Sequence, residues 1–143
     1  IGFGRVFLAR GQRKPRKQEF QTNIVTSDPA RFARNQSIYA EHPALGLGAT
    51  TVGWVHAACV ASARVHQREF LRTHRIPTLF VAAGADTLVS TPAIETYARQ
   101  LRGASLITID GAKHEILQET NLYREQFWAA FDAFIPGEGA DGF

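Results

Sequence analysis

The chain of 143 residues is long enough for one domain and too short for two of ordinary size. A hydrophobic content of 45%, with 10 Phe and 2 Trp, indicates a packed globular interior, and no stretch is long and apolar enough to span a membrane. The net charge of +3 arises from a basic run at residues 10–17, outside which 11 basic residues stand against 13 acidic ones, so a general nucleic-acid-binding surface is disfavoured.

The single cysteine, Cys59, excludes an internal disulfide framework and is compatible with a reducing compartment, so we expect a cytoplasmic protein. The chain starts at Ile1, contains no methionine and shows no secretory signal in its first residues. We therefore expect the natural N-terminus to lie upstream. The predicted strands support the same expectation, because only two convincing strands are predicted and a two-stranded sheet is rarely stable alone.

Residues 1–22 show little periodicity and include an exposed basic loop at 11–17. We interpret this loop as a solvated run of charge, which is the common case. The alternative is peripheral contact with anionic lipid headgroups. The side chains available for that contact are Arg13, Lys14, Arg16 and Lys17.

A first helix is predicted to begin with Ser27 or Asp28 as its cap and Pro29 in its first turn, and to run to about Glu41. A second helix begins at Thr51, with a kink or break after Val65. Apolar residues on the first helix are Phe32, Ile38 and Tyr39; those on the second are Val52, Val55, Cys59 and Ala63, widened by Trp54, Ala58 and Ala61. We expect Cys59 to be buried packing and not a nucleophile.

Residues 76–119 read as strand, helix and strand, with a polar turn after each strand. Residues 78–83 are an apolar run closed by Gly84, which is typical of a buried parallel strand. The helix is predicted to begin with Thr91 as cap and Pro92 inside, and to end at Gly103; its apolar stripe is Ile94, Tyr97, Ala98 and Leu101. The second strand covers 106–109. A right-handed crossover puts both turns at one sheet edge, where α/β proteins build their sites.

The last helix is predicted to start at Thr120 and to stop at Pro136 and Gly137. Its aromatic residues recur at helical spacing, so one stripe would cover the sheet: Tyr123, Phe127, Phe131 and Phe134, flanked by Trp128 and Ile135. Core packing explains this stripe better than a ligand-binding role does.

Asp86 and His114 each follow a strand end directly and are 28 residues apart. A carboxylate there can accept the Nδ1 proton of the imidazole and leave the other ring nitrogen to act as a base. Spacing alone supports a catalytic pair and an incidental pair about equally. Gly84 and Gly111 favour the catalytic pair, since glycines allow tight turns at the sheet edge.

Three segments carry a resemblance to a known family. Residues 78–89 (TLFVAAGADTLV) and 109–119 (IDGAKHEILQE) resemble the acid and histidine segments of α/β-hydrolases of the lysophospholipase and monoacylglycerol-lipase branch. Residues 26–35 (TSDPARFARN) resemble the start of the lid in bacterial lysophospholipases of that branch. One departure is Ala83, where many relatives have Gly.

The resemblance implies the C-terminal portion of an α/β-hydrolase fold, with a helical lid at 1–75 and core at 76–137. The Gly-rich end of the chain, at 138–143, is expected to be a disordered tail. It makes Asp86 the triad acid and His114 the general base. The nucleophile of this fold stands in an upstream G-x-S-x-G motif. None of the five serines here has those glycines (Ser27, Ser37, Ser62, Ser90 and Ser105), so we expect the missing N-terminal core to supply it and this chain alone to be inactive.

The implied activity is hydrolysis of lysophospholipids or monoacylglycerols through an acyl-enzyme. Lid residues available to line an acyl-chain channel are Phe32, Tyr39, Trp54 and Val55, although ordinary packing is the simpler interpretation of each. No cofactor or metal is expected, because His42, His56, His66 and His74 are scattered. The alternatives are a general esterase, an epoxide hydrolase or a peptidase on the same fold, and a non-catalytic lipid- or protein-binding module.

Overall fold

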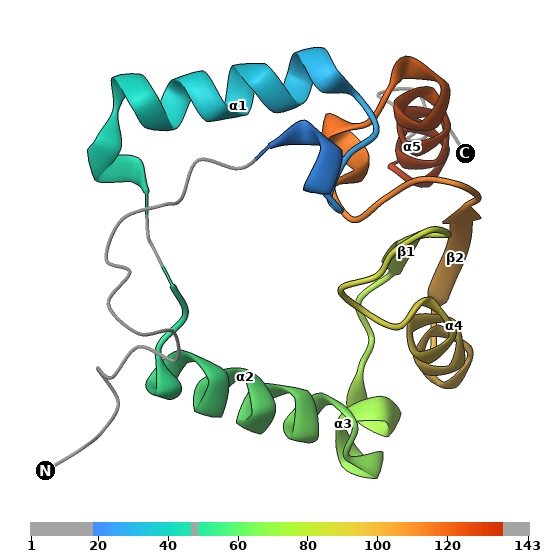
Figure 1. Ribbon diagram of the computed structural model, residues 1–143. Helices are drawn as coiled ribbons and strands as arrows, with labels where there is room; N and C mark the ends of the chain where they lie inside the picture. Colours follow the sequence, from blue (N-terminus) through green and yellow to red (C-terminus); the bar gives the residue numbers. More distant parts are fainter. Residues whose placement is uncertain (1–18, 47–48, 136–143) are drawn as a thin grey trace, which may run out of the picture.

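The computed structural model describes residues 19–46 and 49–135, so the basic loop, the predicted stop at Pro136 and Gly137, and the tail lie outside the described residues. Two parallel strands, β1 (Thr78–Ala83) and β2 (Ala104–Ile109), form a sheet, which lies on the right-hand side of Figure 1. Helix α4 (Thr91–Gln100) connects them, which confirms the predicted strand–helix–strand unit. The second strand begins two residues earlier than the predicted position 106.

The start of α4 differs from the prediction. Ser90, and not Thr91, is the N-cap, and its hydroxyl accepts a hydrogen bond from the amide of Ala93 at 3.3 Å. Thr91 instead donates its hydroxyl to the carbonyl of Ala83 at 2.6 Å. Serine and threonine are both good caps, so sequence alone does not choose between neighbours. Thr91 thereby ties the first turn of the helix to the end of β1.

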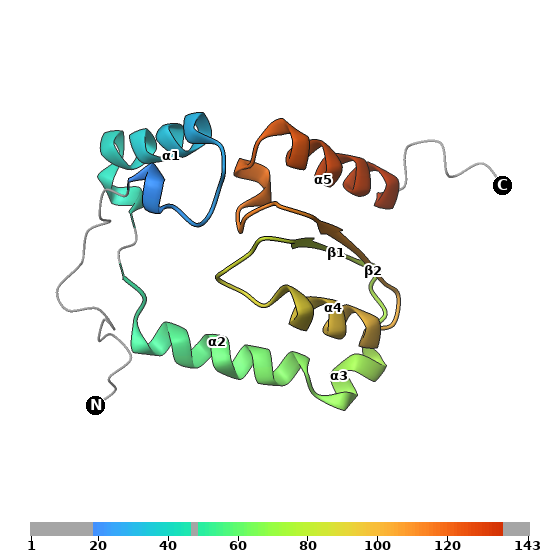
Figure 2. The ribbon, with the colours of Figure 1, turned by 45° about the vertical axis from the view of Figure 1, so that its right-hand side comes forward.

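Helix α5 (Asn121–Phe134) covers the face of the sheet opposite α4, so the sheet lies between two helices (Figure 2). One buried apolar cluster consists of Ala83, Ile109 and Ala112, with Tyr123 and Phe127 packed against it. Of the predicted aromatic stripe, Tyr123 and Phe127 pack against this cluster, Phe134 is half-buried and Phe131 is 39% exposed. Thr120 stands at the N-cap, as predicted, but its side chain makes no capping hydrogen bond.

Among the described residues, three helices precede the sheet: α1 (Pro29–Glu41), α2 (Val52–Val65) and α3 (Arg68–Thr73). Asp28 caps α1 by accepting from the amides of Ala30 at 2.9 Å and Arg31 at 3.0 Å. Thr51 caps α2, and the predicted break after Val65 is confirmed. Short 3₁₀ turns are η2 (Phe20–Thr22), η3 (Pro43–Leu45) and η4 (Ile116–Gln118).

The predicted buried face of α2 is wrong for the described structure. No residue of α2 is buried, Trp54 is 62% exposed, and the thiol-bearing Cys59 is exposed. An apolar helical stripe shows that a helix has a face to bury but not what covers it. At its C-terminal end α2 contacts α4, where the Tyr97 hydroxyl donates to the carbonyl of Val65 at 3.2 Å. None of the described helices is long and apolar enough to cross a bilayer.

Candidate active site

The structure brings the predicted acid and histidine together. Asp86 lies in the loop after β1 and His114 in the loop after β2, and Oδ2 of Asp86 is 2.8 Å from Nδ1 of His114. The Asp86 side chain is 4% exposed, whereas the imidazole is 38% exposed. The acid is therefore enclosed behind the histidine, and the histidine faces outward.

Asp86 is held in its charged form by three hydrogen bonds. Burial raises the pKa of its carboxyl, but hydrogen bonds from His114 and from the amides of Leu88 at 2.7 Å and Val89 at 3.1 Å outweigh burial, and the pKa lies below its ordinary value. An ionised carboxylate only accepts hydrogen bonds, so Nδ1 of His114 is the donor. The imidazole Nε2 can then accept a proton.

Two glycines allow the loops that carry these residues to approach each other. The amide of Gly84 donates to the carbonyl of Ile109 at 2.9 Å, and a Cβ at Gly84 would lie 2.8 Å from Cα of Asp110. Gly111 has a φ of 79°, and a Cβ there would lie 2.7 Å from the Tyr123 hydroxyl. Both glycines are required by the close approach, as the sequence indicated.

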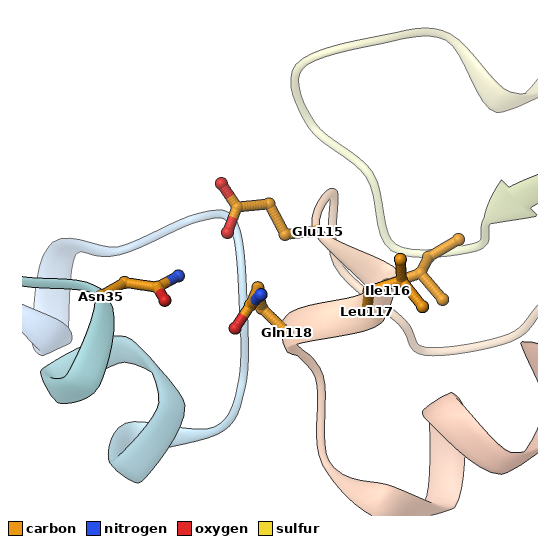
Figure 3. A pocket seen from close by; sticks show the side chains of 5 residues that line it. All are labelled: Asn35, Glu115, Ile116, Leu117 and Gln118. Atoms are coloured by element: carbon orange, nitrogen blue, oxygen red, sulfur yellow. The ribbon is translucent and has the colours of Figure 1, made fainter. Parts of the chain in front are cut away.

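An open cavity of about 420 Å³ adjoins the histidine loop (Figure 3). Asn35 of α1 faces the segment that follows His114 across this cavity. The lining residues are Asn35, Glu115, Ile116, Leu117 and Gln118. The cavity therefore combines amide and carboxylate groups with two aliphatic side chains.

The four residues predicted to line an acyl channel do not line this cavity and lie on two separate helices. On α1, Phe32 is 8% exposed and packs against the ring of Phe20 with centroids 5.5 Å apart, whereas Tyr39 is exposed. On α2, Trp54 is exposed and Val55 is half-buried. Phe32 is thus engaged in packing, and the structure does not gather the four into one surface.

The scattered histidines have other surroundings. His66 bonds through Nδ1 to the carbonyl of Ser62 at 2.8 Å, and His74 bonds through Nε2 to the carbonyl of Ile76 at 2.8 Å. Across residues 19–46 and 49–135, no group of three or more His, Cys, Asp and Glu side chains could hold a metal ion.

Sequence reasoning missed Glu119, whose carboxylate is fully buried five residues after the histidine. It accepts hydrogen bonds from the amides of Lys113 and Ser27, each at 2.9 Å. Ser27 is 92 residues away in the chain, and no local sequence pattern predicts so distant a partner. The one available signal was the placement of Glu119 at the end of the histidine segment.

A parallel strand–helix–strand unit with an acid and then a histidine at one sheet edge matches the C-terminal portion of an α/β-hydrolase, in which the acid and the histidine follow the nucleophile in chain order. The model of the family described as serine aminopeptidase, S33, matches residues 5–121, and the chain belongs to this family. The expected fold class is thereby confirmed. The resemblance to the lysophospholipase and monoacylglycerol-lipase branch is confirmed by this match together with the relatives that follow.

Proteins of known name are also similar to this chain. Lysophospholipase L2 of Escherichia coli strain K12 is 27% identical over 123 residues, covering 81% of this chain and 36% of the relative, and its counterpart in strain O6:H1 gives the same values. A soluble variant of monoglyceride lipase from Saccharomyces cerevisiae, solved with a substrate analogue, shares the fold with a TM-score of 0.61 and 16% identity. That match covers 78% of this chain and 39% of the lipase. The chain spans little more than a third of the length of these relatives.

Proposed function

We propose that this chain supplies the acid and the base of a serine-type carboxylic-ester hydrolase that acts on lysophospholipids or monoacylglycerols. The observation that carries the proposal is the 2.8 Å contact between Asp86 and His114 in a member of this family. The names of the relatives, a lysophospholipase and a monoglyceride lipase, support the substrate class.

In the proposed reaction a serine hydroxyl attacks the ester carbonyl while Nε2 of His114 takes its proton. The imidazolium formed is stabilised by Asp86 and returns the proton to the leaving alcohol, so an acyl-enzyme remains. Water, activated by the same imidazole, then releases the fatty acid. Each step uses the outward-facing nitrogen of a histidine whose other nitrogen is fixed by a carboxylate.

The proposed reaction takes its nucleophile from a segment outside these 143 residues. No serine of the chain stands in a G-x-S-x-G motif, and two have other roles: Ser27 bonds to Glu119 and Ser90 caps α4. We therefore propose that the chain alone has no turnover, that its lid lies within 1–75, and that Tyr39, Trp54 and Val55 reach the acyl chain only in the longer protein.

The test uses the full-length protein with a fluorophosphonate probe and lysophosphatidylcholine. The wild type takes up the probe and releases fatty acid, His114→Ala abolishes both, and Asp86→Ala lowers turnover by about 10³-fold or more. His56→Ala, at an exposed position on α2, is the matched control and retains full activity. Retained activity in His114→Ala would sink the proposal.

The family description favours peptide hydrolysis as a second candidate. The same Asp and His serve both reactions, because each proceeds through an acyl-enzyme. An aminoacyl p-nitroanilide assayed beside lysophosphatidylcholine separates the two. Turnover of the anilide without release of fatty acid would show that the enzyme hydrolyses amides and not lipid esters.

A further inference from the structure

Glu119 holds a buried carboxylate whose partners are hydrogen-bond donors. Its side chain is fully buried, and among the described residues it forms no ion pair. Oε1 accepts from the amide of Lys113 at 2.9 Å. Oε2 accepts from the amides of Ser27 at 2.9 Å and Thr120 at 3.2 Å, and from the Ser27 hydroxyl. Such a group is costly to bury unless these donors satisfy it.

The Lys113 bond to Glu119 and a second bond, made by Glu115, fix the backbone on both sides of His114. The amide of the preceding residue, Lys113, donates to Glu119, and the amide of the following residue, Glu115, donates to the carbonyl of Val25 at 2.8 Å. Thr26 adds a bond from its hydroxyl to the carbonyl of Gln118 at 2.7 Å. The histidine therefore stands between two anchored peptide groups.

We propose that Glu119 is a positioning residue that holds His114 against Asp86 and couples the histidine to the segment that precedes α1. The proposal deepens the proposed function and rests on it. Because Oε1 serves the histidine loop and Oε2 serves Ser27, one side chain joins the two segments.

The chemistry requires a carboxylate at this position. All the partners of both oxygens donate, and a glutamine offers one oxygen while its NH₂ group faces a donor. Glu119→Gln therefore loses either the bond from the Lys113 amide or the bonds from the Ser27 and Thr120 amides. Glu119→Asp keeps the charge but is one methylene too short to reach both sides.

A loosened histidine slows the chemical step more than it weakens substrate binding, since a small misplacement of a catalytic group costs up to about 100-fold in rate. We expect kcat of Glu119→Gln to fall about 10- to 100-fold with KM within about twofold. Glu119→Asp, as the conservative variant, restores part of the rate.

The experiment measures kcat and KM for lysophosphatidylcholine in the full-length protein, per site titrated with fluorophosphonate, so that unfolded protein is not counted. Glu125→Gln, at an exposed position on α5, is the matched control and leaves both constants unchanged. If Glu119→Gln only lowers the melting temperature while kcat per titrated site stays at the wild-type value, the positioning role is wrong. Glu119→Asp decides the question in the same way if Glu119→Gln does not fold.

A second readout does not need turnover. The proton on Nδ1 of His114 gives a low-field NMR signal, assigned by its absence in Asp86→Ala, and we expect this signal to broaden or vanish in Glu119→Gln and to persist in Glu125→Gln. A sharp signal in Glu119→Gln contradicts the positioning role. A wild type that shows the signal but neither takes up probe nor hydrolyses ester contradicts the proposed function alone.

Discussion

Asp86 receives three hydrogen bonds on a carboxylate that is almost fully enclosed. Its folded-state pKa lies below its ordinary value because these bonds outweigh the effect of burial. A depressed pKa contributes stability that is fully present above the unfolded pKa, about 3.9, and that is lost as the pH falls through the folded value.

We therefore predict that the loss of unfolding free energy in Asp86→Asn shrinks as the pH falls below about 4. Urea denaturation of wild type and variant between neutral and acid pH measures it. Asp132→Asn, at an exposed position on α5, is the control for the removal of one carboxylate. A difference for Asp86→Asn that did not change with pH would mean that its charge is not favoured by folding.

Single residues differ in how far the sequence alone predicts them. Asp86 and His114 were predictable because each directly follows a strand, and strand ends of a parallel sheet meet at one edge. Glu119 was not, because a glutamate in sequence reads as exposed and its partner Ser27 lies 92 residues away.

Among the elements, the turn after β2 depends on a glycine in two ways. Gly111 has a positive φ, and a side chain there would also meet the Tyr123 hydroxyl of α5. Gly103, before β2, has a φ of 73°, but a Cβ at this position would meet no atom within 4 Å. Comparing substitutions at Gly103 and Gly111 therefore separates the cost of backbone strain, which both share, from the cost of the contact with Tyr123, which only Gly111 has.

We predict that Gly103→Ala costs about 1 kcal/mol from backbone strain alone, and that Gly111→Ala costs about 1–3 kcal/mol more because of the contact. Thermal or urea unfolding of the two variants measures the difference. Equal losses would show that Tyr123 moves aside freely, and that α5 does not hold the turn.

The strands and helices were largely predictable because their signals are local. Pro29 and Asp28 mark the start of α1, and the apolar run at 78–83 marks β1. What α2 packs against was not predictable, since apolar periodicity identifies a face without its partner, and Cys59 proved exposed.

At the scale of the whole molecule, hydrogen bonds between residues 26–31 and residues 118–121 join the start of α1 and the segment before it to the segment around η4. We call this set of bonds the polar seam. The Arg31 side chain contributes to this seam through three partners. It bonds to Asp28 at 2.9 Å, to the Asn121 side chain at 2.6 Å and to the carbonyl of Glu119. Its side chain is 19% exposed, so water replaces these bonds poorly.

Arg34 lies three residues further along the same helix and makes one exposed bond, to the Gln118 side chain at 2.9 Å. We predict that Arg31→Gln lowers the free energy of unfolding by about 1–3 kcal/mol, whereas Arg34→Gln lowers it by less than about 0.5 kcal/mol. Both variants remove one positive charge, so urea denaturation of the pair isolates the seam from a general effect of charge. Equal losses of unfolding free energy would mean that apolar contacts, and not the polar seam, hold the two segments together. Glu119 would then lack the rigid surroundings that positioning of His114 requires.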